Sequence, residues 1–344
     1  MLFPLLRPFI HAIDPERAHR LSIEALKLLP LPPMPAGDET LAIDVAGVRF
    51  PNPVGIAAGY DKDAEVPDAL LGLGFGFVEV GSITPRPQEG NPKPRLFRLS
   101  EDRAVINRMG FNNAGADAAE TRLKRRKPRG VLGINIGANK DSADRVADYA
   151  DMTRRMAPYA SYLTANISSP NTPGLRALQD EGALTELLDA VMEARGTDGP
   201  PVFLKVAPDL EPADIDAIAR IGIDKGLGAL IVSNTTISRP PLISRDAGET
   251  GGLSGAPLKS LALQRLRDFR KATGGELPLV GVGGIGSVDD AWDRIRAGAS
   301  LVQVYSAMVY EGPGLGRVIA KGLGHKLKQH GMTSLPQAVG SEAP

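Results

Sequence analysis

The sequence predicts an α/β fold: a closed (β/α)8 TIM barrel with a short N-terminal helical hairpin extension. The first observation is that short β-branched runs alternate with helical patterns from about Gly55 to Met308. The second is that eight strand candidates occur in about 250 residues, the usual size of such a barrel. The third is that several of these strands are apolar throughout, as strands covered on both faces should be. A doubly wound sheet is the competing architecture, but eight successive units without a composition break favour closure.

The eight strand candidates are short aliphatic runs separated by helical periodicity. In chain order they are 54–57, 77–80, 130–134, 162–165, 202–205, 229–232, 279–282 and 301–304. Helical periodicity is evident over 143–156, 184–194, 212–225, 258–273 and 288–297. A hairpin over 41–45 and 48–50 precedes the first barrel strand, and we expect it to plug one end of the barrel.

The first 36 residues have a different character. Residues 1–13 are apolar, and Asp14-Pro15-Glu16 supplies an N-cap, a proline at the first helical position and an acid in the first turn. We expect this second helix to end near Leu29, before Pro30, Pro32 and Pro33. The two helices either pack on the barrel or lie on a membrane surface and form an apolar tunnel. The chain thus divides into 1–36, a barrel over 37–335 and a flexible tail over 336–344.

Composition excludes several classes of function. The chain has 40 basic and 40 acidic residues, so nothing global indicates a nucleic-acid partner. It has no cysteine, which excludes disulfides, thiolate nucleophiles and cysteine zinc sites. Four histidines without a pair at helical metal spacing predict no metal site. With no signal peptide and no apolar run of roughly 20 residues, the expected compartment is cytoplasmic.

One predicted strand, 162–165, ends abruptly in a polar loop over residues 166–176 (NISSPNTPGLR). An apolar strand that stops in a rigid polar loop is typical of a barrel active site. Asn166 and Asn171 can each donate and accept hydrogen bonds, and Ser168 and Ser169 are candidate nucleophiles or bases. An ordinary turn is the other interpretation, because serine, proline, asparagine and glycine are common turn residues.

Residues 281–286 (GVGGIG) match G-x-G-x-x-G between a strand and a helix. A Rossmann site is weakly supported, because no acid ends the next strand, where a ribose ligand is expected. In a barrel, the seventh and eighth loops instead bind phosphate through backbone N–H groups and a helix N-terminus. Gly283 and Gly284 with Tyr305 and Ser306 would then hold one phosphate, which predicts a mononucleotide-type cofactor rather than NAD.

Lys62 and Lys205 lie at or just after the ends of barrel strands. A lysine in a barrel mouth is costly unless it has an anionic partner. Schiff-base chemistry is one use, and charge stabilisation beside a flavin ring is another. A solvent-facing lysine is the third interpretation, and it fits Lys205 less well because that residue lies within an apolar strand.

Neutral amides and hydroxyls follow several predicted strands. Asn107, Asn112 and Asn113 lie in one loop, Asn135 follows the third strand, and residues 234–236 (NTT) follow the sixth. Each fits a turn, but together they suit a small polar heterocycle with imide and carboxylate groups.

These segments together resemble the class 2 (quinone-dependent) dihydroorotate dehydrogenases over nearly the whole chain. The most specific matching segments are 57–62 (AAGYDK), 81–88 (GSITPRPQ), 107–113 (NRMGFNN), 166–176 and 232–236 (VSNTT). The resemblance implies a flavin barrel that oxidises dihydroorotate to orotate in pyrimidine biosynthesis and passes electrons to a membrane quinone. The soluble class of the family uses a cysteine base, which this cysteine-free chain excludes.

The resemblance also implies roles for individual residues. Ser169 would be the general base that takes the C5 proton, and the C6 hydride would go to the flavin N5. Lys205 would stabilise the anionic reduced flavin, and Lys62 would contact both flavin and substrate. The other substrate-binding residues would be Asn107, Arg108, Met109, Gly110, Phe111, Asn166, Asn171, Asn234 and Thr235.

FMN is the cofactor that the resemblance implies. The residues expected to bind it are Ala58, Gly59, Tyr60, Asp61, Lys62, Ser82, Asn135, Asn166, Lys205, Ser233, Gly255, Gly284, Tyr305 and Ser306. The N-terminal helices would then lie on a membrane surface, with His19, Arg98 and Tyr305 along the quinone path. The implied location is peripheral, on the cytoplasmic side of the inner membrane, and the implied state is a monomer.

Two other classes of function stay open at this point. A phosphate-binding lyase or aldolase barrel would use Lys205 as a Schiff base. A membrane-surface binding protein with an inactive barrel would not need so many polar groups at one barrel end.

Overall fold

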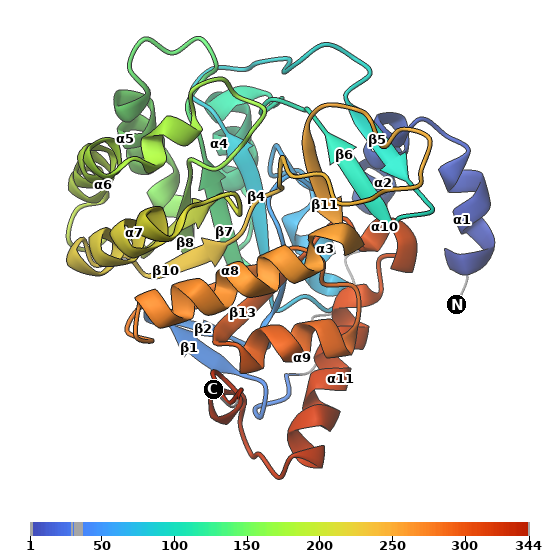
Figure 1. Cartoon of the computed structure of the whole chain (residues 1–344). Coiled ribbons are helices and arrows are strands. Elements are labelled where there is room, and N and C mark those ends of the chain that lie inside the picture. The colour runs from blue at the N-terminus through green and yellow to red at the C-terminus, as the bar shows by residue number, and fades with distance from the viewer. Residues whose placement is uncertain (1–2, 29, 31–36, 343–344) are drawn as a thin grey trace.

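Eight parallel strands close into a barrel in the computed structural model, which describes residues 3–28, 30 and 37–342. Strand β13 pairs in parallel with β3, which completes the ring (Figure 1). The predicted (β/α)8 barrel is confirmed, and every strand candidate overlaps an observed strand. The barrel strands are β3 (Val54–Ile56), β4 (Phe77–Ile83), β7 (Val131–Ile136), β8 (Tyr162–Asn166), β9 (Val202–Val206), β10 (Ala229–Val232), β12 (Leu279–Val282) and β13 (Ala299–Val304).

Helices surround this barrel (Figure 1), and α5 and α9 each begin at a side chain that caps the first turn. Asp144 accepts a hydrogen bond from Ala147 N at 2.9 Å at the start of α5, and Ser287 accepts one from Asp290 N at 3.1 Å at the start of α9. The helices after the barrel strands are α3 (Pro67–Gly72), α4 (Gly115–Arg125), α5 (Arg145–Met156), α6 (Glu181–Arg195), α7 (Pro212–Asp224), α8 (Lys259–Ala272), α9 (Val288–Arg296), α10 (Met308–Glu311) and α11 (Leu315–Gln329).

A hairpin of β1 (Ile43–Val45) and β2 (Val48–Phe50) closes the end of the barrel where the strands begin. The Phe50 ring lies 5.1 Å from Phe77 and 6.2 Å from Tyr162, centroid to centroid, and these two residues are the first of β4 and β8. The predicted plug is therefore confirmed, and the barrel opens at the opposite end, where the strands finish.

A second, three-stranded antiparallel sheet was not predicted. Its order is β11 (Gly252–Gly255), β6 (Ala104–Asn107) and β5 (Leu96–Leu99), and it is built from the segments that follow β4 and β10. It has a small core of its own, made of Phe97, Leu99, Ala104, Ile106 and Leu253. The sheet lies between the barrel and the N-terminal helices (Figure 1), so it extends one wall of the barrel mouth.

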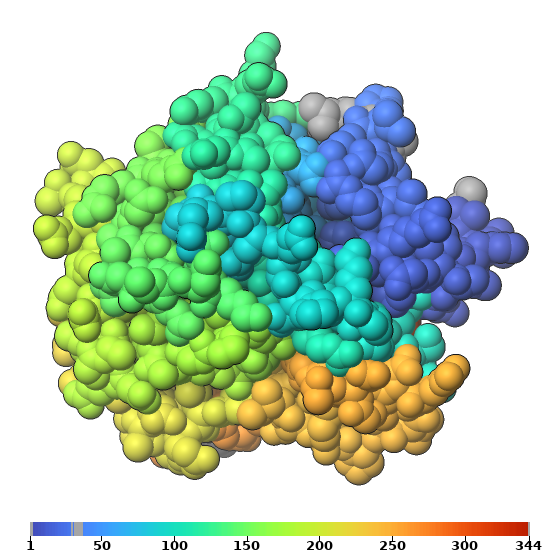
Figure 2. Space-filling view, turned by 90° about the horizontal axis from the view of Figure 1, so that it is seen from above, coloured from blue at the N-terminus to red at the C-terminus, as the bar shows by residue number. Residues whose placement is uncertain are grey.

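The predicted N-terminal helical hairpin is confirmed as α1 (Phe3–His11) and α2 (Pro15–Leu28). Helix α1 has no buried residue, and α2 buries only Ile23. Figure 2 shows this pair at one side of the molecule, beside the β5–β6 segment. Of the prolines expected to stop α2, Pro32 and Pro33 lie outside the described residues, and the boundary at residue 36 stays a prediction.

The tail, expected to be flexible over 336–344, lies against the barrel helices as far as it is described. Ala338 is buried, and Gly340 N donates to Ile295 O at 3.0 Å. Glu342 forms an ion pair with Arg267 of α8. The residues whose polar composition predicted a loose tail instead form an ion pair with α8 and backbone hydrogen bonds with α9.

Candidate active site

A cavity of about 1110 Å³ occupies the open end of the barrel and extends to α1 and α2. Its barrel end is lined by residues that end or follow the strands, including Ser82, Asn166, Lys205 and Ser233. Its outer end is lined largely by apolar residues of the helices and of β5, among them Ile10, Ile13, Leu21, Leu26 and Leu96. One continuous space thus joins a polar barrel mouth to an apolar passage.

Nearly all residues that the sequence singled out line this cavity. They are His19, Ala58, Gly59, Tyr60, Lys62, Ser82, Arg98, Asn107, Met109, Gly110, Phe111, Asn166, Ser169, Asn171, Lys205, Ser233, Asn234, Thr235, Gly255, Gly284, Tyr305 and Ser306. They come from the ends of seven of the eight barrel strands or from the loops after them, all but β7, and from α2 and β5. The fold thus brings together residues that are far apart in the chain.

Three of the residues that the resemblance assigns to the site do not line the cavity, and neither does Ser168, which is fully buried. The Arg108 guanidinium pairs with Glu249 at 2.6 Å and lies over the Phe97 ring, because an acidic partner is available outside the mouth. The Asp61 carboxylate is buried and accepts hydrogen bonds from the backbone N–H groups of residues 65 and 66, both at 2.8 Å. Asn135 is fully buried beneath the cavity floor. This geometry therefore disfavours direct ligand contact by the side chains of Arg108, Asp61 and Asn135.

The loop after β8 is held in place and is more than an ordinary turn. Ser169 lines the cavity and is 6% exposed, and its Oγ accepts a hydrogen bond from Asn171 N at 3.3 Å. Asn171 Nδ2 in turn donates to Asn107 Oδ1 at 3.2 Å. Arg176 fixes the loop by donating to Ser168 O and Thr235 O and by pairing with Asp209, each at 3.0 Å. The Ser169 hydroxyl is thereby placed in the wall with little freedom.

Two lysines bring positive charge to the barrel mouth. Burial lowers the pKa of Lys205, and the negative charge of Glu79 opposes this shift. Burial also lowers the pKa of Lys62, to about 8, against the opposing effect of Asp63. Within the described residues no ion pair or hydrogen bond occupies either ammonium group, although both line the cavity. An anionic or electron-rich ligand would compensate their burial.

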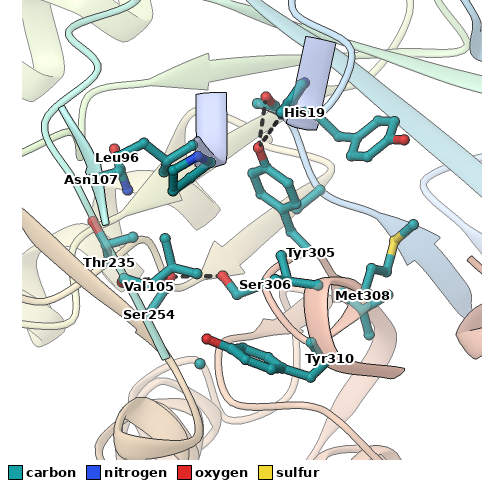
Figure 3. Close-up of a pocket in the computed structure, with 18 of the residues that line it drawn as sticks. His19, Leu96, Val105, Asn107, Thr235, Ser254, Tyr305, Ser306, Met308 and Tyr310 are labelled. Carbon is teal, nitrogen blue, oxygen red and sulfur yellow. Dashed lines mark hydrogen bonds between the residues drawn. The ribbon is translucent and has the colours of Figure 1, made fainter. Parts of the chain in front are cut away.

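The loop after β12 comes close to the start of α8. Gly283 and Gly284 have φ values of +106° and +71°, and a Cβ at Gly284 would lie 2.4 Å from Lys259 Cα, so only glycine fits there. On the adjacent wall, the hydroxyls of Ser254 and Ser306 lie 2.7 Å apart (Figure 3). Open backbone beside hydroxyl groups suits a phosphate group.

The outer end of the cavity carries an aromatic group around His19. The Tyr305 hydroxyl donates to Gly59 O at 3.1 Å and lies 3.4 Å from His19 Nδ1 (Figure 3). Burial, reinforced by the positive charge of Lys62, lowers the pKa of His19 to about 4. His19 is therefore a neutral ring at neutral pH, packed between Tyr60 and Tyr305. Arg98 donates to His11 O at 2.8 Å and so ties α1 to β5.

Sequence reasoning missed several polar residues of the site. Glu79 is fully buried in β4 under the cavity, and Gln303 of β13 lines it with Oε1 unpartnered among the described residues. Ser254 was missed because β11 was not predicted. Glu79 and Gln303 did leave a signal, since a charged or amide residue inside an apolar strand needs buried partners.

Comparison with known proteins places this geometry in a wider context. The family described as dihydroorotate dehydrogenase matches residues 40–327. Two proteins named dihydroorotate dehydrogenase (quinone) are similar over their lengths. That of Erythrobacter litoralis is 82% identical, covering 99% of this chain and 100% of the relative. That of Novosphingobium aromaticivorans is 70% identical, covering 99% of each.

Solved structures agree with the sequence comparison. The dihydroorotate dehydrogenase of Eimeria tenella, crystallised in complex with ferulenol, superposes with a TM-score of 0.91. It is 42% identical, and the match covers 96% of both chains. The ligand-free form of the same enzyme superposes equally well, with a TM-score of 0.91. The shared fold therefore includes the N-terminal part of this chain as well as its barrel.

Proposed function

The chain belongs to the dihydroorotate dehydrogenase family, and on this premise we propose how its residues carry the reaction. It oxidises dihydroorotate to orotate in pyrimidine biosynthesis, with a quinone as electron acceptor. The observation that supports the proposal most strongly is the single cavity that joins a polar barrel mouth to an apolar passage. The polar substrate and the apolar quinone can then bind at opposite ends of the same cavity.

FMN is the cofactor we propose, and the walls of the cavity fit it. Gln303 Oε1 and Thr235 Oγ1 are buried at the cavity wall without a hydrogen-bond partner among the described residues. A bound ligand would supply the missing partners. The glycine loop with Ser306 suits its phosphate, and Lys205 suits its ring. When bound, FMN supplies the acceptor for a hydride and passes the electrons on to quinone. The other binding residues we propose are Ala58, Gly59, Tyr60, Lys62, Ser82, Asn166, Ser233, Gly255 and Tyr305.

Ser169 is the general base in this proposal. The oxidation removes a proton from C5 and a hydride from C6 of dihydroorotate and leaves a C5=C6 double bond. Serine is a weak base, so its own hydroxyl proton must leave through a neighbour or water as the C5 proton arrives. The Asn171 N–H that donates to Ser169 Oγ stabilises the negative charge that develops on that oxygen.

Amides and one lysine hold the substrate in this scheme. Asn107 and Asn171 are already joined by a hydrogen bond at 3.2 Å, so their remaining groups are oriented before a ligand arrives. Lys62 lines the same cavity as these two asparagines, and its ammonium group can form an ion pair with the carboxylate of orotate. The other residues of the proposed substrate site are Met109, Gly110, Phe111, Asn166, Asn234 and Thr235.

The N-terminal helices form the quinone entrance in this proposal. Leu5, Phe9 and Leu21 are 74%, 74% and 50% exposed, an unusual amount of apolar surface for a small helical pair. No described helix has the length and apolarity needed to cross a bilayer. We therefore propose that a monomer lies on the cytoplasmic face of the inner membrane through α1 and α2, with His19, Arg98 and Tyr305 along the quinone path.

An anaerobic absorbance spectrum tests the proposal directly. The purified protein should be yellow and should bleach when dihydroorotate is added. A yellow protein that does not bleach would point to another substrate for the same flavin barrel. A colourless protein that cannot be reconstituted with FMN would contradict the proposal and return attention to Lys205 as a Schiff-base lysine, testable by borohydride trapping.

A further inference from the structure

A buried chain of hydrogen bonds begins at Glu79 and runs upward beneath the cavity. Asn135 Nδ2 donates to Glu79 Oε1 at 2.8 Å, and the Ser82 hydroxyl donates to Asn135 Oδ1. Asn166 Nδ2 then donates to Ser82 Oγ at 2.9 Å. This lower half crosses from β4 to β7 and β8, and only its upper members, Ser82 and Asn166, line the cavity.

The chain continues from Asn166 into the loop after β10. The Ser168 hydroxyl donates to Asn166 Oδ1 at 2.7 Å, and Asn234 Nδ2 donates to Ser168 Oγ at 2.9 Å. The backbone N–H of Thr235 donates to Asn234 Oδ1 at 2.7 Å. Every donor along the whole chain therefore points the same way, from Thr235 toward Glu79.

Such a direction is not inherent in the residues between the two ends. Asparagine carries a donor on one side of its amide and an acceptor on the other, and serine can donate or accept. Three asparagines and two serines in series would form hydrogen bonds equally well if every amide were turned over. The direction is fixed only where the chain meets a group that can act in one sense alone. One such group is the Ser168 backbone N–H, which donates to Asn166 Oδ1 at 3.3 Å.

Glu79 is such a group at the lower end. It is fully buried, and three donors surround its carboxylate: Asn135 Nδ2, the Tyr162 hydroxyl at 3.0 Å and Gln303 Nε2 at 2.7 Å. Three donors match the acceptor-only character of an ionised carboxylate. At the upper end, the Thr235 backbone N–H can only donate, so both ends select the same direction.

We propose that Glu79 is a positioning residue, an anion under the barrel floor that fixes which amide groups the mouth presents to its ligand. Asn166 and Asn234 line the cavity, and each has one N–H that no hydrogen bond within the described residues uses. In this direction of the chain, their side-chain oxygens accept hydrogen bonds from Ser168 and Thr235, and one N–H of each amide can donate to a ligand. The ligand class this favours is one rich in carbonyl and carboxylate acceptors.

The charge of Glu79 has a second effect, on Lys205. The carboxylate partly offsets the burial that lowers the pKa of this lysine, so it helps to keep an ammonium group beneath the cofactor site. At a pH at which Lys205 is an ammonium ion in both proteins, loss of the carboxylate would leave the positive potential of Lys205 on a bound flavin less balanced. An anionic reduced flavin would then be favoured, and the reduction potential would become more positive.

Glu79→Gln is the variant that tests the positioning role, which rests on the proposed function. It keeps the shape of the side chain but removes the charge, and one of the three donors must now face an amide N–H. In the flavin-loaded enzyme we expect orotate, titrated through the flavin absorbance shift, to bind about tenfold more weakly, the loss of about one oriented hydrogen bond. We also expect a more positive flavin potential, which a merely loosened fold would not produce.

Tyr162→Phe is the matched control. It removes one hydrogen bond to the same carboxylate but leaves the charge and the Asn135 contact in place, so orotate affinity and flavin potential should stay at wild-type values. If Glu79→Gln does not fold, Asn135→Ala takes its place, because it removes the amide that links Glu79 to Ser82 and should also weaken orotate binding about tenfold.

The outcomes separate this inference from the proposed function. If wild-type protein neither binds FMN nor bleaches with dihydroorotate, the proposed function fails, whatever the variants do. If wild-type protein does both, and Glu79→Gln, or Asn135→Ala in its place, binds orotate within twofold of wild type, the positioning role of Glu79 is overturned. Equal losses in Tyr162→Phe and Glu79→Gln would also overturn it, because the charge would then not be the cause.

Discussion

The barrel mouth and the N-terminal helical pair satisfy opposite physical requirements. In the mouth, polar atoms are buried and connected, and Glu79 is 0% exposed with three hydrogen-bond donors around it. In the helical pair, apolar side chains face outward, and Phe9 is 74% exposed. The mouth therefore has a preorganised polar interior, whereas α1 and α2 expose an apolar surface that suits contact with a membrane.

The two regions are also attached to the molecule in different ways. Residues of the mouth follow strands of a closed barrel, so their backbone positions are set by the sheet. Helix α2 buries one side chain, Ile23, and ion pairs also attach it to the rest of the chain: Glu16 with Arg95 at 2.7 Å, and Arg20 and Lys27 with Glu65. In the proposed function, the reacting groups thus lie on loops fixed by the closed sheet, and the acceptor enters beside a helical pair with one buried side chain.

Removing residues 1–30 is the most severe way to break this comparison. The barrel keeps its closed sheet and its flavin site, so dihydroorotate should still bleach the bound flavin. Quinone reduction should be lost, because the apolar lining from α1 and α2 is gone. The measurement is quinone reduction beside reduction of a soluble dye. Normal quinone kinetics after truncation would show that the helical pair is not the acceptor passage.

Ser169→Ala acts on the mouth alone. Flavin and orotate binding should be retained, since the backbone N–H groups and amides around the loop stay in place. Flavin reduction by dihydroorotate, followed by stopped flow, should slow by roughly 10²–10⁴-fold, the usual contribution of a general base. A rate close to wild type would remove Ser169 from that role.

The pH dependence of orotate binding probes the charge in the mouth. Burial lowers the pKa of Lys62 to about 8, so the ammonium group is present below pH 8 and is lost as the pH rises through that value. Affinity for the orotate anion should therefore be constant below pH 7 and fall about tenfold by pH 9. Lys62→Arg keeps its charge in this range and is the control, with a flat profile expected. A flat wild-type profile would mean that Lys62 does not pair with the anion.

The same division explains what the sequence could predict. The barrel was predictable because eight apolar runs and their helices repeat in order, and the site loops could be assigned because they follow those strands. The β5–β6–β11 sheet was not, since its strands are four residues each and β11 (GLSG) carries glycine and serine in place of β-branched residues. It forms through pairing of segments nearly 150 residues apart, which no local pattern records.

The direction of site side chains was the other limit. Arg108, Asp61 and Asn135 belong to segments that reach the mouth, but each finds a stronger partner elsewhere: Glu249, backbone N–H groups and Glu79. A motif fixes where the backbone goes, whereas the orientation of a polar side chain depends on which donors and acceptors the fold places beside it. Glu79 is the clearest case, because its three donors come from three different strands.

A single apolar side chain gives the smallest and sharpest test of the comparison. Phe9→Ser removes a ring from the exposed face of α1, and we expect vesicle binding, measured by co-sedimentation, to weaken about fivefold, since only part of the burial energy of a phenylalanine is lost at an interface. Flavin reduction by dihydroorotate should not change. Val318→Ser is the control, because Val318 is 61% exposed on α11 and belongs to neither α1 nor α2. Equal weakening in both variants would mean that the protein contacts membranes through its surface at large, and the contrast between the mouth and the helical pair would then lose its functional meaning.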